Sequence, residues 1–365
     1  MSITHVDVQA QSPTGGGAPA SLDARHRLPR PLLALAWVVL VVLGYLAPQL
    51  FGGSDRTYST FVLIAILAVM AYGIDIVISY LGEVSLGHTL FWAGGAYVTA
   101  VFAVKYGWSA LACLLAALTF CAALALVLGL ATIRTREFVF SLVTYAAAII
   151  GVTIVSNNMF LGGSDGLVGL PLLELPVVGG TYAARTNAEF WPIAFGCLVL
   201  VVLLIGRFRR SRLGSSALMA QMNPALATTL GVDVRRVRVL VFVLSAPVAG
   251  LAGWLYAYQR SYVSPDLLSP YFLLFMLTAV ILPGRRQLLG PLVGAALLTV
   301  QVEQFSFGGN ADKIVLGGVL AAVLLLSPDG LAGLARGALR LRRRSGRRPS
   351  PREAAGVNPA PGGTA

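Results

Sequence analysis

The sequence predicts an all-α, polytopic integral membrane protein of about ten transmembrane segments, and three observations support this fold class. The 365-residue chain is 57% hydrophobic and 12% charged, with a mean hydropathy of +0.79, whereas soluble domains carry about 25% charged residues. Uninterrupted apolar runs such as 31–51 and 111–133 recur, and about 20 residues match the roughly 30 Å apolar core of a bilayer. The runs do not alternate in polarity, and lipid cannot satisfy open backbone groups, so we expect them to be helical.

The first apolar run follows a tail at 1–30 that is rich in Gly, Ala, Ser, Gln and Pro. We expect this basic tail to be disordered and cytoplasmic rather than a cleavable signal, because the apolar run exceeds a signal h-region in length. The predicted segments are 31–51, 59–80, 86–104, 109–131, 138–156, 190–206, 239–260, 270–283, 288–303 and 313–327. The eighth and ninth are short enough to form a re-entrant or broken pair. A transmembrane domain is therefore predicted at 31–327, with a basic, disordered cytoplasmic tail at 328–365 that lies near anionic lipid.

Arginine positions predict which side of the membrane each loop occupies. With the N-terminus in the cytoplasm, most of the 27 Lys and Arg residues fall in cytoplasmic loops, as the positive-inside rule requires. The others are scattered singly, at Arg56, Lys105, Arg185, Arg260 and Lys313. The pattern predicts an even number of crossings of the plasma (inner) membrane, with both termini cytoplasmic. It also accounts for the net charge of +12, so nucleic acid is not an expected partner.

Residues that carry catalysis or bind metals are not evident in the sequence. Cys113, Cys121 and Cys197 all lie inside apolar runs, where we expect small buried side chains rather than disulfides or metal ligands. The sequence has no phosphate-binding loop, no nucleophile paired with a base and no paired carboxylates. We therefore predict no catalytic residue, no metal and no cofactor, and any ATP would be bound by another chain.

Two loops are long enough to have a function of their own. The external loop, 157–189, contains a polar group of candidate site residues, which are Gly163, Ser164, Asp165 and Gly166. In the cytoplasmic loop, 207–238, Asn223 precedes Pro224, as is typical of an N-cap followed by the first helical turn. We expect a short helix there, from 224 to about 230, that ends at Gly231.

Small and ionisable residues in the membrane region mark a candidate translocation path. Ionisable groups at membrane depth are costly and usually face a cavity or a partner, and glycines allow close helix approach or helix breaks. The candidates are Asp75, Glu83, Ser85, His88, Gly94 and Gly95. For the glycine-rich stretch, helix packing alone is the alternative. For Asp75, the alternatives are lining the path and pairing with an arginine such as Arg134.

Other small residues are spaced for close helix packing. The pairs are Ala246 with Gly250, Ala249 with Gly253, and Gly290 with Gly294. Small residues four apart let helix backbones approach closely, so a packing role is the favoured interpretation. Pro247 lies among them and predicts a kink, because it removes a backbone donor and clashes with the preceding turn.

Four stretches, taken jointly, resemble one known family. They are GEVSLGH at 82–88 with GGAY at 94–97, GGSDGLVGLP at 162–171, FVLSA at 242–246 with AGLAG at 249–253, and YVSPD at 262–266 with LGPLVGA at 289–295. In this order they resemble the permease subunits of branched-chain amino acid ABC importers, in particular the longer of the two permease types. Relative to that family's pattern, acids replace amides at Asp75 and Glu83, residues 215–225 lack charged side chains, and PGRR at 283–286 stands in place of Gly-Gly-x-Gly.

The resemblance implies a subunit of a larger transport complex. A second, related permease would complete the pore, two cytoplasmic ATP-binding subunits would drive it, and an extracytoplasmic solute-binding protein would deliver the solute. The loop 207–238, with Asn223, Pro224 and Gly231, would then couple the permease to the ATPases.

The function predicted on this basis is import of branched-chain or related small amino acids. Urea, short amides and other small solutes are alternatives within the same architecture. A second class of function is an ion-coupled secondary transporter that uses Asp75, Glu83 and His88, and a third is a membrane scaffold without transport activity.

Overall fold

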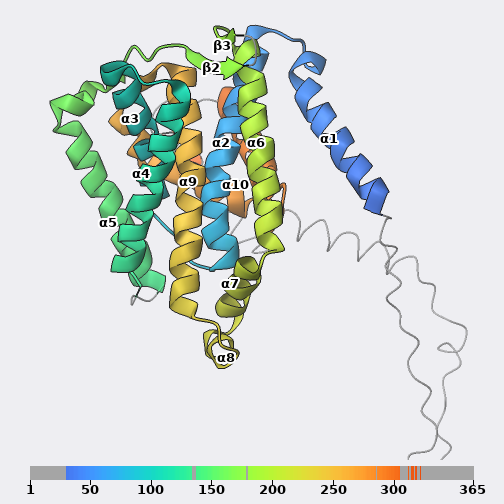
Figure 1. The fold of residues 1–365 in the computed structure, drawn as a ribbon, viewed down its shortest axis with the longest axis vertical. Coiled ribbons are helices and arrows are strands. Elements are labelled where there is room, and N and C mark those ends of the chain that lie inside the picture. The colour runs from blue at the N-terminus through green and yellow to red at the C-terminus, as the bar shows by residue number, and fades with distance from the viewer. Residues whose placement is uncertain are drawn as a thin grey trace, which may run out of the picture. The chain divides into compact units, whose positions relative to one another are not determined.

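Helices dominate the structure, a computed structural model that describes residues 30–133, 137–177, 180–284 and 286–304, and the single residues 311, 314, 315, 317, 318 and 321 (Figure 1). The longer helices are α1 (Arg30–Leu50), α2 (Asp55–Tyr80), α3 (His88–Tyr106), α4 (Ala110–Ala131), α5 (Glu137–Ser156), α6 (Asn187–Arg209), α9 (Val234–Arg260), α10 (Pro270–Ile281) and α11 (Gly290–Gln304). These nine fall on the first nine predicted segments. The predicted terminal tails and most of the tenth segment lie outside the described residues.

Five helices in the described part of the chain are long and apolar enough to cross a membrane. They cover Asp55–Tyr80, Ala110–Ala131, Phe138–Ser156, Asn187–Arg209 and Val234–Arg260. Leu35–Leu50, Pro270–Ile281 and Gly290–Glu303 are shorter apolar helices, in agreement with the short eighth and ninth segments of the sequence prediction. The helical, polytopic class is thus confirmed, while the number of ten crossings stays a prediction.

The chain divides into two compact units, 1–44 and 45–365. Of the first unit, the structure describes residues 30–44, which form the beginning of α1. The second unit contains the end of α1 and the remaining elements, and all contacts discussed below lie within it.

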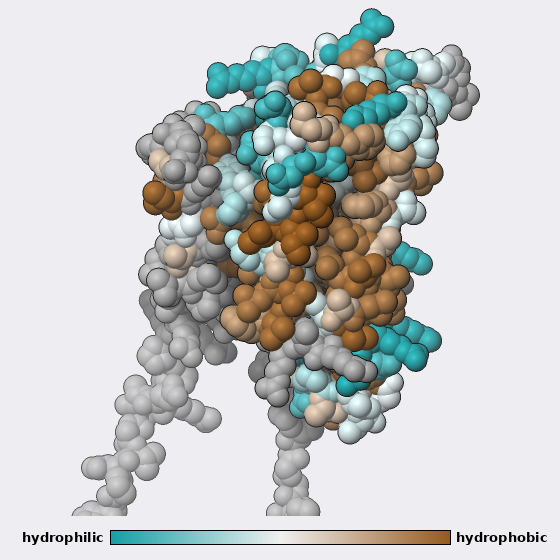
Figure 2. Space-filling model, turned by 90° about the vertical axis from the view of Figure 1, so that its left-hand side faces the viewer, coloured by the Kyte–Doolittle hydropathy of each residue, from teal (hydrophilic) through white to brown (hydrophobic). Residues whose placement is uncertain are grey.

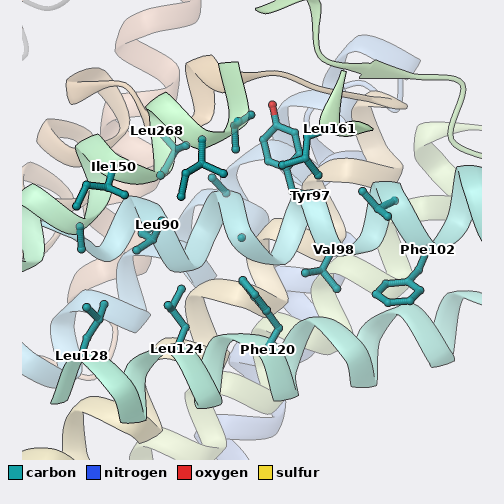
Figure 3. A pocket seen from close by; sticks show the side chains of 17 residues that line it. Leu90, Tyr97, Val98, Phe102, Phe120, Leu124, Leu128, Ile150, Leu161 and Leu268 are labelled. Carbon is teal, nitrogen blue, oxygen red and sulfur yellow. The ribbon is translucent and has the colours of Figure 1, made fainter. Parts of the chain in front are cut away.

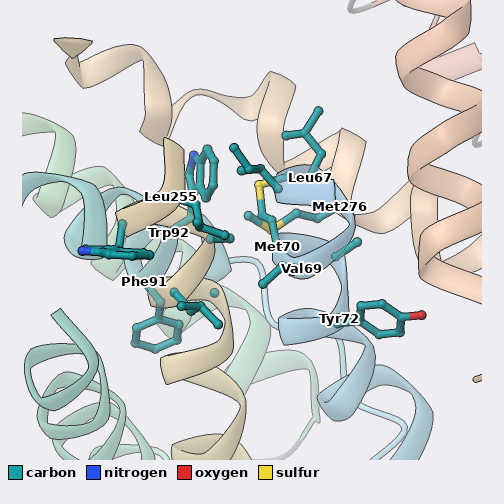
Figure 4. Packing of buried hydrophobic residues seen from close by; sticks show 14 of the residues in the cluster. Leu67, Val69, Met70, Tyr72, Phe91, Trp92, Leu255 and Met276 are labelled. Carbon is teal, nitrogen blue, oxygen red and sulfur yellow. The ribbon is translucent and has the colours of Figure 1, made fainter. Parts of the chain in front are cut away.

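Helix α2 forms the centre of the second unit, where it packs against α6, α9, α10 and α11. In its most apolar window, 89% of the residues are buried, compared with 22% in α4 and in α5. Figure 4 shows Leu67 and Met70 of α2 beside Leu255 of α9 and Met276 of α10. Because lipid is as apolar as these side chains, close van der Waals packing rather than water exclusion holds such helices together in a bilayer.

Glycines allow several helices to approach at backbone distance. A Cβ added at Gly253 of α9 would lie 2.1 Å from the carbonyl oxygen of Trp92 on α3, and one at Gly95 would lie 2.4 Å from that of Gly250. At Gly294 of α11, it would lie 2.0 Å from the carbonyl oxygen of Ala279 on α10. The packing role expected for these small residues is therefore confirmed. Helix α9 continues through Pro247, and the predicted kink stays a prediction.

The external loop of the sequence prediction contains short strands that the all-α prediction missed. Strand β1 (Leu167–Val168) pairs with β4 (Tyr262–Val263), and β2 (Leu173–Val177) pairs with β3 (Gly180–Ala184), both antiparallel. Short 3-10 helices, η1 (Met159–Leu161), η2 (Gly163–Asp165) and η3 (Pro265–Leu268), complete this region. The two-residue strands are too short to show an alternating pattern, and β2 contains Pro176, so sequence periodicity could not reveal them. We call this region, with β1–β4 and η1–η3, the strand end.

The opposite end of α2, α6 and α9 carries two further helices, α7 (Arg212–Met222) and α8 (Pro224–Thr229), and is called the α7–α8 end (Figure 1). On the face drawn in Figure 2, hydrophobic side chains form a band with hydrophilic side chains above and below it. Exposed apolar residues of α4 and α5, such as Leu115, Val127, Phe138 and Ile150, are typical of a lipid-facing surface.

Candidate functional site

The α7–α8 end begins with the short helix that the sequence predicts. The side-chain oxygen of Asn223 accepts a hydrogen bond from the Leu226 backbone N–H at 3.0 Å, and Pro224 takes the first helical position. Gly231 follows with a φ of +82°, a conformation that glycine adopts without strain. All three residues therefore have the local roles that the sequence indicated for them, and α8 is confirmed.

Helix α7 was missed at the sequence level. Its signals are the N-cap Ser211, whose hydroxyl accepts from the Gly214 N–H at 3.1 Å, and the buried small residues Gly214, Ala217 and Ala220 at a spacing of three. Small side chains rather than bulky apolar ones face the neighbouring helices, so the usual hydrophobic period is weak. α7 packs against α2, α6 and α9.

Apolar side chains are exposed at the tip formed by α8 and its flanks. Met222 is 79% exposed, Leu226 56% and Leu230 66%. Arginines surround this tip in the sequence on both sides, from Arg207 to Arg212 and from Arg235 to Arg238. An exposed apolar group within a polar rim is typical of a protein–protein contact.

Asp75 is buried near the end of α2, with 4% of its surface exposed. The hydroxyl of Ser79 donates to its carboxylate at 2.6 Å. The same hydroxyl accepts from the backbone N–H of Arg286 at 3.0 Å. Asp75 thus belongs to a hydrogen-bonded network at the α7–α8 end, and Arg134, the arginine suggested as its partner, lies outside the described residues.

Glu83 is 5% exposed and lies in the loop between α2 and α3. Its carboxylate forms an ion pair with Arg238 of α9, at 2.6 Å. Because a buried carboxylate needs such a partner, the pair fixes the α2–α3 loop against α9.

His88 and Ser85 are fully buried where α3 begins. The Nε2 atom of His88 lies 3.2 Å from the Ser245 hydroxyl of α9, and its ring contacts the edges of Phe91 and Phe242. These surroundings hold the imidazole in the helix core, and neither residue lines the cleft described below.

Gly94 lines an apolar cavity of about 550 Å³ between α3, α4 and α5. Figure 3 shows Leu90, Val98 and Phe102 of α3, Phe120 and Leu124 of α4, and Ile150 of α5 around it. Gly95 instead contacts α9, as described above. The six residues of the predicted path therefore lie in five different surroundings, and the structure does not gather them into one site.

A second cleft, of about 530 Å³, has a mixed lining and lies between α5, the beginning of α3 and the η3–α10 segment. Its polar lining residues are Thr89, Tyr145, Thr153, Ser156, Ser164, Asp266 and Ser269. Leu86, Ile149 and Leu273 are among the apolar ones. Ser164 is the predicted external-loop residue that lines this cleft. Asp266, from the η3 segment, supplies the one carboxylate of the lining. Asp266 belongs to the YVSPD stretch at 262–266, for which no role in a site was predicted.

The remaining external-loop candidates build the wall beside this cleft. The Tyr262 hydroxyl donates to the carbonyl oxygen of Asp165 at 3.0 Å. Gly166 has a φ of +78°, and a Cβ added there would lie 2.3 Å from the Val263 carbonyl oxygen. Gly163 is buried and also has a positive φ, of +57°. The strand pair β1–β4 thereby brings two distant sequence motifs, at 162–171 and 262–266, into contact.

The described part of the chain thus combines apolar helices long enough to span a membrane with a cleft of mixed lining and a helical loop at one end. The family model described as the permease component of branched-chain amino acid transport systems matches residues 57–325, so the chain belongs to that family. The resemblance seen in the sequence is thus confirmed.

Named relatives agree with this assignment. The high-affinity branched-chain amino acid transport system permease protein LivM of Escherichia coli (strain K12) is 26% identical, over 85% of this chain and 75% of the relative. The permease protein LivH of the same strain is 25% identical, over 79% of this chain and 96% of the relative. The xylose/arabinose import permease protein XylH of Sulfolobus acidocaldarius is 26% identical, over 41% of this chain and 43% of the relative. No solved structure matches the chain at a significant level.

Family membership gives the chain its class. It is a permease subunit of an ABC importer and a multi-pass protein of the plasma (inner) membrane, and it is a transport subunit rather than an enzyme.

Proposed function

We propose that this chain forms one half of a pore that imports branched-chain or related small amino acids, driven by two ATP-binding subunits. A second, related permease would form the other half, and an extracytoplasmic solute-binding protein would deliver the solute. The observation that carries the proposal is the α7–α8 tip, where Met222, Leu226 and Leu230 are exposed. An exposed apolar group between arginine-rich flanks is typical of a contact with another protein, which fits a separate motor subunit.

Charge distribution supports an orientation with the α7–α8 end in the cytoplasm. This end carries Arg207, Arg209, Arg210, Arg212, Arg235, Arg236, Arg238 and Arg286. The strand end and the helix termini beside it carry single basic residues, Arg56, Lys105, Arg185 and Arg260. By the positive-inside rule, this asymmetry supports an orientation in which the tip faces the cytoplasm, where ATP is available. The proposal includes ten crossings with both termini in the cytoplasm.

The cleft beside the strand end is our candidate for this chain's part of the solute path. Its hydroxyl groups could hydrogen-bond the carboxylate of an amino acid, and Asp266 could pair with the ammonium group. Leu86, Ile149 and Leu273 would face an apolar side chain. A cleft with both kinds of lining suits a branched-chain amino acid better than a uniformly polar solute such as urea.

The surroundings of Asp75, Glu83 and His88 favour an ATP-driven importer over an ion-coupled carrier. Each of the three is buried and faces a partner, which is Ser79, Arg238 or Ser245 respectively. Coupling ions would have to reach these groups and displace such partners. We propose that the three residues stabilise the helix ends, and that the path candidates Ser85, Gly94 and Gly95 serve helix packing beside the path.

Reconstitution tests the proposed function. Proteoliposomes would contain this chain with the permease and ATPases encoded beside it, and the binding protein would be added outside. We expect uptake of labelled leucine, isoleucine and valine that requires hydrolysable ATP and is insensitive to dissipation of proton and sodium gradients. Competition by urea and short amides at equal concentration should be weak. Uptake driven by an ion gradient in the absence of ATP would contradict the proposal.

A further inference from the structure

The turn between α10 and α11 contains an arginine in an unusual backbone conformation. Arg286 has a φ of +65°, in the left-handed region that residues with a Cβ seldom occupy. Such a conformation persists where surrounding contacts hold it. The contacts of Arg286 reach two other parts of the molecule, the ends of α2 and α7.

The first contacts are with the last turn of α2. The Arg286 backbone N–H donates to the Ser79 hydroxyl at 3.0 Å, and its Nε–H donates to the Ser79 carbonyl oxygen at 3.2 Å. Carbonyl groups in the last turn of a helix have no partner within the helix, and a cation there also faces the negative end of the helix dipole. Arg286 therefore caps α2, and through the Ser79 hydroxyl it is connected to the buried Asp75 carboxylate.

The next contact is with the last turn of α7. The Nη2 group of Arg286 donates to the side-chain oxygen of Gln221 at 2.5 Å. The Gln221 side chain also lies close to the α2–α3 loop, since a Cβ added at Gly82 would lie 2.7 Å from its nitrogen. One guanidinium thus joins the end of α2, the end of α7 and the α10–α11 turn.

From this juxtaposition we infer that Arg286 is a positioning residue for transport, which makes α7 move together with α2 and the α10–α11 turn. The inference rests on the proposed function, in which ATPase subunits displace the α7–α8 tip. α7 has small buried side chains along its packed face, and Gln221 in its last turn accepts the bond from Arg286. The bonds of Arg286 convert a displacement of α7 into a displacement of α2, the most buried of the five long apolar helices.

The test compares the solute transported per ATP hydrolysed in reconstituted complexes. In Arg286→Ala, the complex should assemble and hydrolyse ATP within about twofold of the unmodified rate, while uptake per ATP falls about tenfold, because charge-assisted bonds are lost. Gln221→Ala should lower the same ratio, and the double variant should be no worse than Arg286→Ala, as expected for residues that act as a pair. Arg286→Lys should restore little, because a compact ammonium lacks the rigid planar fork whose separate N–H groups reach the Ser79 carbonyl and the Gln221 amide together.

Arg236→Ala is the matched control, since the Arg236 side chain is 83% exposed and pairs with Asp233 within its own helix turn. In Arg236→Ala, the amount of solute transported per ATP hydrolysed should stay unchanged. An unchanged ratio in both Arg286→Ala and Gln221→Ala would overturn the inference and leave the proposed function intact. If Arg286→Ala does not accumulate, Gln221→Ala decides the question alone. Absence of ATP-driven uptake in the unmodified complex would instead contradict the proposed function.

Discussion

The two ends of the second unit are built from different kinds of contact. At the strand end, short strand pairs and glycines with positive φ bring backbone against backbone, as at Gly166 and Val263. At the α7–α8 end, long side chains make the connections, through Arg238 to Glu83 and through Arg286 to Gln221. Charge follows the same division, because arginines cluster at the α7–α8 end.

This difference shows how one chain can provide both a frame and a moving part. Backbone contacts at van der Waals distance leave few alternative arrangements, so the strand end suits a fixed wall for the solute cleft. A charge-assisted hydrogen bond from a long side chain connects two elements at a defined point, so a displacement of one element is passed to the other. The α7–α8 end therefore suits the transmission of movement from a partner.

The largest expected effect comes from breaking the buried ion pair at the α7–α8 end. Arg238→Ala removes the guanidinium from Glu83 and should lower the free energy of unfolding by about 3 kcal/mol, because the carboxylate stays buried. Denaturation in detergent followed by circular dichroism measures this. Arg236→Ala, which affects an exposed pair, should cost less than about 1 kcal/mol. Equal losses of unfolding free energy in the two variants would show that the buried Glu83–Arg238 pair stabilises the fold no more than an exposed pair does.

The next effect tests the backbone contacts of the strand end. Gly166→Ala introduces a Cβ at a φ of +78°, and this Cβ would lie 2.3 Å from a carbonyl oxygen. Gly169→Ala introduces a Cβ at a similar φ of +83°, but no other atom lies within 4 Å of it. Gly169→Ala should cost about 1–2 kcal/mol from strain alone, and Gly166→Ala about 2 kcal/mol more, because overpacking is added. The same denaturation experiment compares them. Equal losses would argue that this end is not closely packed.

A moderate effect on transport, without a loss of stability, is expected at the cleft. Asp266→Asn removes the charge proposed to face the solute ammonium and should raise KM for leucine uptake about tenfold, while the complex stays assembled. Asp165→Asn is the control, because Asp165 lies at the same end but does not line the cleft. A normal KM in the Asp266 variant would remove this residue from the path.

The smallest effect is expected at Asp75. Asparagine keeps an oxygen that can accept the hydrogen bond from Ser79, so Asp75→Asn should leave uptake within about twofold of the unmodified complex. Complete loss of uptake in this variant, with normal assembly, would favour an ion-coupled carrier in which Asp75 takes up the ion.

The sequence predicted the spanning helices well because their signal is strong. Runs of about 20 apolar residues need no tertiary information to be read as helices, and Asn223, Pro224 and Gly231 are local signals for α8. The strands β1 and β4 could not be predicted, because two-residue strands exist only through contact between segments that lie about a hundred residues apart, as in the pairing of Leu167 with Val263.

The candidate site was less predictable, because function here depends on which side chains face each other. An ionisable side chain in an apolar segment was the criterion that selected Asp75, Glu83 and His88. Such a side chain can be buried against a partner as well as line a translocation path, so the criterion does not separate the two cases. Asp266 and Thr89 line the cleft but stand in ordinary turn and helix sequences. Arg286 had a signal, since it replaces a glycine of the family pattern, yet its partners Ser79 and Gln221 are visible only in the fold.

Docking of the ATP-binding subunits at the α7–α8 tip is the central claim, and one measurement tests it directly. Leu226→Asp places a charge on the exposed apolar group, while Thr228→Asp places one on an exposed polar position of the same short helix. We predict that membranes contain both variants in normal amount, and that the ATPases co-purify with Thr228→Asp but are lost at least about tenfold with Leu226→Asp. Undiminished co-purification with Leu226→Asp would contradict the account.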